Sequence, residues 1–192
     1  LIINERLNDN NDEGRAIMVR MQILSASEQE IFDKPPQFNH VERRRFFDFP
    51  ASLLELAGSL RQPHYQVLFL VSSGYFKAGK RFFSPSEFYQ RDLDYVARKL
   101  SIDDISNRHY PDRARQRHQK MILDFYGFSA FDKKAEEMLS AEIADMARTH
   151  LKPRLIFDRC MDFIIQSKIQ VPSVRSLTDL IRTGLQARKT EL

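Results

Sequence analysis

Residues 107–131 read NRHYPDRARQRHQKMILDFYGFSAF, and they carry the start, the period and the end of one α-helix. Pro111 suits the first helical position, because the N–H that proline lacks would have no partner there. Asp112 then falls in the first turn, where the helix dipole favours a negative charge. Gly127 suits the left-handed residue that follows a helix. The sequence therefore predicts a helix that begins at Pro111 and ends just before Gly127.

The predicted helix has two unlike faces. Its buried face is formed at helical spacing by Ala114, His118, Met121, Ile122 and Phe125. Its polar face consists of Arg113, Arg115, Gln116, Arg117, Gln119 and Lys120. Almost no acid interrupts the polar face, whereas ordinary surface helices mix the two signs of charge. Because arginine and lysine neutralise phosphates, and arginine and glutamine also bind base edges, the face is a candidate DNA contact. A solvated basic surface is the alternative.

The composition is that of a soluble globular protein, with 192 residues, 42% hydrophobic and 29% charged. The net charge of +4 permits a nucleic-acid partner without requiring one. The single Cys160 excludes an internal disulfide and fits a reducing cytoplasm. No apolar run reaches the length of a membrane span, and no signal peptide is recognisable. We therefore expect a cytoplasmic protein without a membrane partner.

The segment before the basic helix is predicted to be helical after a distinct start. Residues 1–20 are polar and without helical period, which indicates a leader or added arm, or else a native polar arm. Ser25 and Glu28 form a capping-box pattern that begins a short helix. Further helices are expected over 41–49 and from Pro50 to about residue 60.

A longer helix is predicted from Pro63 to Gly79, since its length and both ends favour a helix over a buried strand. With the helix before it, this segment makes a helix-turn-helix-like unit. Three basic residues near its end are further DNA-contact candidates, namely Lys77, Lys80 and Arg81. Ser84 and Glu87 are predicted to cap the next helix.

The C-terminal part is predicted to hold three helices. An acidic amphipathic helix covers about 132–150, a second begins at Pro153, and Ser173 caps the last. The last two resemble a second helix-turn-helix unit, whose outward side carries Arg175, Ser176 and Arg182. With no persistent strand pattern, the fold class is all-α, a multi-helix bundle with two helix-turn-helix-like units. The predicted divisions are 1–20, 21–128 and 129–192, with one continuous helical domain as the alternative.

Residues that would support catalysis are not recognisable. The five histidines lack metal-ligand spacing, and there is no glycine-rich phosphate loop or nucleophile elbow. We therefore predict no catalytic residue, no metal ligand and no cofactor, and we do not expect this chain to be an enzyme by itself.

Five segments, in this order, resemble the N-terminal region of the Tn-three family of replicative transposases. They read QILSASEQEIF (22–32), HYQVLFLVSSGYFKAGKRF (64–82), LDYVARKLSI (93–102), RARQRHQKMILDFYGFSAF (113–131) and VPSVRSLTDLI (171–181). The resemblance covers residues 22–185. It implies a helical region that binds the terminal inverted repeats of a transposon, while a distant C-terminal domain of the long family proteins cleaves the strands.

The resemblance also implies roles for single residues. The fourth segment maps Arg113 and Arg117 onto DNA contacts, and His118 and Tyr126 onto packing positions. The turn before His64 departs from the family pattern, because it carries fewer basic residues than the family often has. The full set of predicted DNA-binding residues is Lys77, Lys80, Arg81, Arg108, Arg113, Arg115, Gln116, Arg117, Lys120, Arg175, Ser176 and Arg182.

The expected partners are double-stranded DNA at the terminal inverted repeat, the remainder of a transposase chain, and another copy of this chain. The expected location is the bacterial cytoplasm, at the nucleoid. The alternative function is a helical protein–protein interaction module within a larger assembly, which the acidic helix at 132–145 and the modest net charge would suit.

Overall fold

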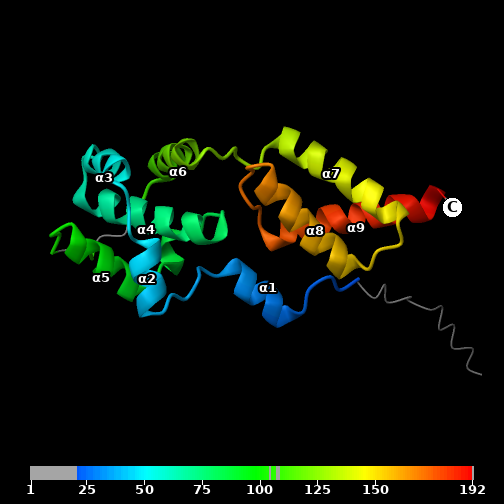
Figure 1. Cartoon of the computed structure of the whole chain (residues 1–192), viewed down its shortest axis with the longest axis horizontal. Helices are drawn as coiled ribbons and strands as arrows, with labels where there is room; N and C mark the ends of the chain where they lie inside the picture. The colour runs from blue at the N-terminus through cyan, green and yellow to red at the C-terminus, as the bar shows by residue number, and fades with distance from the viewer. Residues whose placement is uncertain (1–20, 104, 107–108, 192) are drawn as a thin grey trace, which may run out of the picture.

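The computed structural model describes residues 21–103, 105–106 and 109–191, and every regular element in these ranges is helical. The all-α prediction is therefore confirmed. The expected arm at residues 1–20 lies outside the described residues. Figure 1 shows the helices, which are α1 (Ala26–Asp33), α2 (His40–Phe46), α3 (Ala51–Gly58), α4 (Pro63–Gly79), the 3-10 turn Pro85–Glu87, α5 (Gln90–Lys99), α6 (Asp112–Tyr126), α7 (Lys133–Arg148), α8 (Pro153–Gln166) and α9 (Val174–Glu191).

Several helix ends lie where the sequence predicts them. The hydroxyl of Ser25 accepts the N–H of Glu28, whose carboxylate accepts the N–H of Ser25 in return. At the start of α9, the Ser173 hydroxyl accepts the N–H of Ser176 at 3.1 Å. Gly127 ends α6 in the left-handed conformation, with φ of 71°. These contacts satisfy backbone groups that a helix end would otherwise leave without partners.

One helix end differs from the prediction by one residue. Pro111 has an extended ψ of 140° and precedes α6, so the helix begins at Asp112. α4 ends at Gly79, as predicted, and Lys80 directly after it adopts the left-handed conformation with φ of 56°. The chain leaves α4 there to make contacts with the C-terminal half of the molecule, which the local sequence does not encode.

The prediction that a helix begins at Ser84 is wrong. Ser84 and Glu87 do form a capping box, but it closes only a three-residue 3-10 turn. Phe88 then takes an extended conformation and packs edge-on against Tyr75, with ring centroids 5.3 Å apart. Burial of this aromatic ring interrupts the helical path, so α5 begins later, at Gln90.

The first core is formed by α2–α6, with α4 at its centre (Figure 1). Residues 67–76 of α4 are buried without interruption because other helices cover all its sides. None of the described helices combines the length and apolar character needed to cross a membrane.

A Cβ atom on Gly74 would lie 2.3 Å from Cε1 of Phe47, so α2 approaches α4 closely only because residue 74 is glycine.

A buried ion pair joins three helices of the first core. Nε of Arg43 in α2 donates to Oδ1 of Asp92 at 2.6 Å, and Asp92 in α5 is fully buried. The hydroxyl of Tyr75 in α4 donates to the other carboxylate oxygen at 2.7 Å. Burial, followed by these contacts with Asp92, raises the pKa of Tyr75 above its ordinary value. The carboxylate therefore has hydrogen-bond donors on both oxygens, as a buried charge requires.

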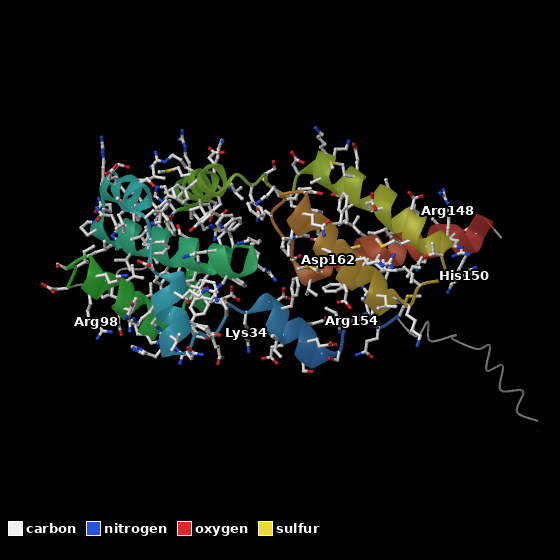
Figure 2. All side chains as sticks on the ribbon, viewed as in Figure 1. Lys34, Arg98, Arg148, His150, Arg154 and Asp162 are labelled. Carbon is white, nitrogen blue, oxygen red and sulfur yellow. The ribbon has the colours of Figure 1, made fainter. Side chains whose placement is uncertain are left out.

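The second core is formed by α7, α8 and α9 together with α1 and the residues just before it. Ile23 and Leu24 are buried here, although the predicted division assigns residues 21–128 to one unit. Arg154 of α8, labelled in Figure 2, forms a partly exposed ion pair with Glu28 of α1, so the start of α1 lies beside α8. Both ends of the described chain thus build the second core, while the predicted domain division remains a prediction.

The two cores meet where three segments are joined by backbone hydrogen bonds, namely residue 129, residues 168–171 and residue 80. The N–H of Ser129 donates to the carbonyl of Lys168, and the N–H of Gln170 donates back to Ser129, each at 2.8 Å. The N–H of Val171 donates to the carbonyl of Lys80, also at 2.8 Å. These bonds satisfy backbone groups of the connecting loops and fix the second core beside the end of α4.

Candidate nucleic-acid interface

A groove of about 630 Å³ lies between the α3–α4 turn and α6. It is lined by Ser59, Leu60, Arg61, Gln62, Tyr65, Arg117, His118 and Met121. A second hollow, of about 420 Å³, adjoins it and is lined by Pro111, Arg113, Ala114 and Arg117. Arg117 borders both concave regions, so the polar side of α6 and the turn of the first helix pair form one surface, which we call the α6 groove.

The α6 groove holds an unneutralised positive charge. Arg61, Arg113 and Arg117 are all exposed, and none has an ion-pair partner among the described residues. Their guanidinium groups present planar sets of donors that match phosphate oxygens or the edge of a guanine. Gln62 lines the groove, and Gln116 is exposed next to Arg117 in the chain, beside another hollow that Lys120 also lines. Both offer paired amide donors and acceptors. This chemistry suits a polyanion that carries phosphates and planar base edges.

Two other cations of α6 are less available than the sequence indicates. Arg115 is half-buried and pairs with Asp112 at 2.8 Å, one turn before it. Lys120 pairs with Asp124 at 2.9 Å, one turn after it. The expectation that the polar face lacks acid is therefore wrong at both ends, because helical spacing brings Asp112 and Asp124 beside the basic residues.

His118 lies beneath the groove and is 1% exposed, as the resemblance implies for a packing residue. Its Nδ1 shares a hydrogen bond with the hydroxyl of Tyr110, and its ring meets Tyr65 edge-on at 5.7 Å. Burial, followed by repulsion from Arg117, lowers the pKa of His118 to about 4. The ring is therefore neutral at pH 7, and it supports the start of α6 rather than contributing charge to the groove.

Tyr126, the other packing position, lies near Phe76 of α4 with ring centroids 5.7 Å apart. Burial raises the pKa of Tyr126 to about 12, so the hydroxyl stays neutral at ordinary pH. Together with His118, it fixes α6 on α4.

The basic residues near the end of α4 bind the protein itself. Lys77 donates to the carbonyls of Arg45 and Asp48, at 3.0 and 3.1 Å. Lys80 donates to the carbonyl of Lys77 at 2.6 Å, and burial lowers its pKa. Arg81 lies between two aromatic rings, each 4.9 Å from its guanidinium carbon. These three predicted candidates lie close together near the end of α4, none of them lines the α6 groove, and each contacts the protein itself.

The remaining candidates lie on α9 or outside the described residues. Arg175 is exposed at the start of α9 and lies 3.9 Å from Asp179. Ser176 is exposed beside it. Arg182 is half-buried and bonds to Asp179 at 2.8 Å and to the carbonyl of Met21 at 3.3 Å. The start of α9 is therefore a second small polar surface. Arg108 is not described.

Sequence reasoning did not include Arg61 and Gln62 among the site residues. Two signals in the sequence concern this turn: the short break between two predicted helices, and its place before His64, where the resembled family often carries more basic residues. Their place opposite Arg117 depends on how α6 packs across the helix pair, and no local pattern in the sequence records that packing.

These features define an all-helical domain with two cores and a basic groove beside its first helix pair. The chain belongs to the family described as a domain of unknown function, DUF4158, whose model matches residues 23–184. No functionally curated protein matches the sequence.

Proposed function

We propose that this chain binds double-stranded DNA at the terminal inverted repeats of a transposon, as the N-terminal region of a Tn-three family transposase. The observation that carries the proposal is the α6 groove, where Arg61, Arg113 and Arg117 keep their charge without an ion-pair partner among the described residues. In a concave surface, such charges attract phosphates together. The proposed contacts are these arginines with Gln62 and Gln116.

The resemblance in sequence supports the same assignment. Its basic segment maps Arg113 and Arg117 onto DNA contacts, and these are two of the unpaired arginines of the groove. Arg175 and Ser176 are the proposed contacts of the second helix pair, α8 and α9. Lys77, Lys80, Arg81 and Arg182 are engaged within the protein, so we do not propose them as DNA contacts.

The proposed function of this region is recognition, with strand cleavage assigned to another part of a longer protein. Among the described residues, no group of three or more His, Cys, Asp or Glu side chains could hold a metal ion. Supplied with Mg²⁺ or Mn²⁺ and a terminal repeat, the purified chain should leave the DNA intact on a denaturing gel. Metal-dependent nicking that disappears when an acidic residue of this chain is replaced would contradict the proposal.

The proposal is tested by two substitutions on α6. Arg117 is unpaired and mid-helix, so Arg117→Ala should weaken binding to the cognate repeat by about 1–3 kcal/mol, and less on scrambled DNA. Lys120, one turn further along α6, is a flexible point charge in an exposed pair with Asp124. If it leaves Asp124 to bind a phosphate, Lys120→Ala should weaken both DNAs equally and reduce the salt slope by about one unit. Binding isotherms on both duplexes at matched salt concentrations provide the measurement.

The outcomes separate three interpretations. Equal losses on both duplexes for Arg117→Ala would leave DNA binding intact but remove base reading from α6. No loss with either substitution would favour a protein-interaction module instead. That alternative has one specific observation in its favour, an apolar groove of about 200 Å³ beside Leu54, which is 42% exposed.

A further inference from the structure

A continuous stack of side chains connects the two cores through Arg81. The guanidinium carbon of Arg81 lies 4.9 Å from the ring centroid of Phe83 and 4.9 Å from that of Phe32. Phe83 meets Tyr75 of the first core edge-on at 6.0 Å, and Phe32 meets Phe157 of the second core edge-on at 5.6 Å. The two cation–π contacts restrict the position of the guanidinium group relative to both rings.

Hydrogen bonds extend the same connection to α9. Nη1 of Arg81 donates to the carbonyl of Phe32, and both terminal nitrogens lie 3.3 Å from Oδ1 of Asp33. The same Oδ1 accepts the N–H of Val174, the first residue of α9, at 3.5 Å. Arg81, just after α4, is therefore linked through Asp33 to the end of α9 that carries Arg175. We call these contacts the Arg81 clasp.

Burying the Arg81 side chain in the clasp has a cost in free energy. The side chain of Arg81 is 12% exposed, and its buried Nε has no hydrogen-bond partner among the described residues. An unsatisfied buried donor is destabilising. An apolar residue would fill the space without that penalty, but it would lose the directed bonds to Phe32 and Asp33, which fix orientation.

We infer that Arg81 is a positioning residue that fixes the α6 groove and the start of α9 at one relative orientation, so that both contact one DNA duplex in a single register. The inference rests on the proposed function. Because the grooves of a duplex repeat about every 10–10.5 base pairs, two linked surfaces act together only if their separation matches that repeat. A rigid connection then makes the second contact effectively intramolecular.

The first experiment needs no DNA. Spin labels are placed at Arg98 on α5 and Arg148 on α7, which lie in different halves of the molecule (Figure 2), after a Cys160→Ala change removes the native thiol. Arg81→Leu should broaden the distribution of label-to-label distances. Arg91→Leu is the matched control, because Arg91 also lies over a ring, that of Tyr89, but within the first half of the molecule. A distribution unchanged by Arg81→Leu would overturn the inference.

A second variant covers the case in which Arg81→Leu does not fold. The side chain of Asp33 is 47% exposed, so Asp33→Ala removes the link between Arg81 and α9 with little change in burial. It should also broaden the distance distribution. A narrow distribution in this folded variant would equally overturn the clasp.

The second experiment uses the terminal repeat with five base pairs inserted between the two footprinted contact regions. The wild-type chain should lose about tenfold or more in affinity, because half a helical turn places one contact on the wrong side. Arg81→Leu should lose clearly less on insertion. Equal losses in both chains would remove the phasing role. If the wild-type chain binds no DNA, the proposed function and the phasing role both fail. The spin-label distances still test whether Arg81 fixes the orientation of the two halves.

Discussion

Gly74 lies where the packing leaves no room for a side chain. Any Cβ there would meet the ring of Phe47, which is fully buried in the first core. We therefore expect Gly74→Ala to destabilise the protein by about 1–3 kcal/mol, the usual effect of overpacking a core. Gly58→Ala is the control, since no atom lies within 4 Å of the position that its Cβ would occupy and helical alanine is favourable. Urea unfolding of both variants provides the measurement, and equal midpoints would contradict the account.

His118 predicts the direction of a pH effect on stability. Its pKa is about 4 when folded and ordinarily 6.5, so the unfolded chain binds more protons between these values. The free energy of unfolding is therefore unaffected by this group above pH 6.5. It falls as the pH falls from 6.5 toward 4, by up to about 1.4 kcal/mol per pH unit. The free energy of unfolding, measured in urea at pH 7 and pH 5, should fall in the wild-type chain.

The contribution of His118 is isolated by comparing variants. His118→Gln should show a smaller loss of stability between the two pH values, because glutamine does not titrate. His40→Gln, at an exposed position at the start of α2, should keep the wild-type loss. If His118→Gln retains the full pH dependence, another group is responsible.

At the scale of helices, the ion pair of Arg43 and Asp92 joins α2, α4 and α5. Asp92→Ala leaves Arg43 without its partner in a site only 13% exposed, and we expect a loss of about 3–5 kcal/mol. Asp124→Ala removes an exposed ion pair with Lys120 and should change stability by about 1 kcal/mol at most. Thermal and urea unfolding compare the two. Similar small losses for both would show that the buried pair does not hold the helices together.

At the scale of the whole molecule, charge placement predicts the salt dependence of DNA binding. If Arg61, Arg113 and Arg117 each neutralise one phosphate, replacing all three by alanine should lower the slope of log affinity on log salt by about 2–3 units. Arg148→Ala is the control, since Arg148 lies on α7 and pairs with Asp145. Affinities measured from low to physiological salt provide the slopes. A slope unchanged by the triple substitution would place the DNA elsewhere.

The helical class and most helix ends can be read from the amino-acid sequence. Capping boxes, prolines and Gly127 act within a few residues, so their effect is legible without knowing the fold. The basic face of α6 and the burial of His118 follow from helical period in the same way. Even there, the polarity pattern does not reveal the ion pairs of Arg115 and Lys120.

The availability of each basic residue depends instead on contacts between distant parts of the chain. Arg81 has the sequence context of an exposed cation at a helix end, but it lies between rings of Phe32 and Phe83, 49 and 2 positions away in the chain. Arg61 joins the groove because α6 packs beside the α3–α4 turn. Residues 23–33 join the second core, whose other helices begin only at Lys133. Such contacts depend on the complementary shapes of distant surfaces, whereas helix period and caps depend on neighbours in the chain.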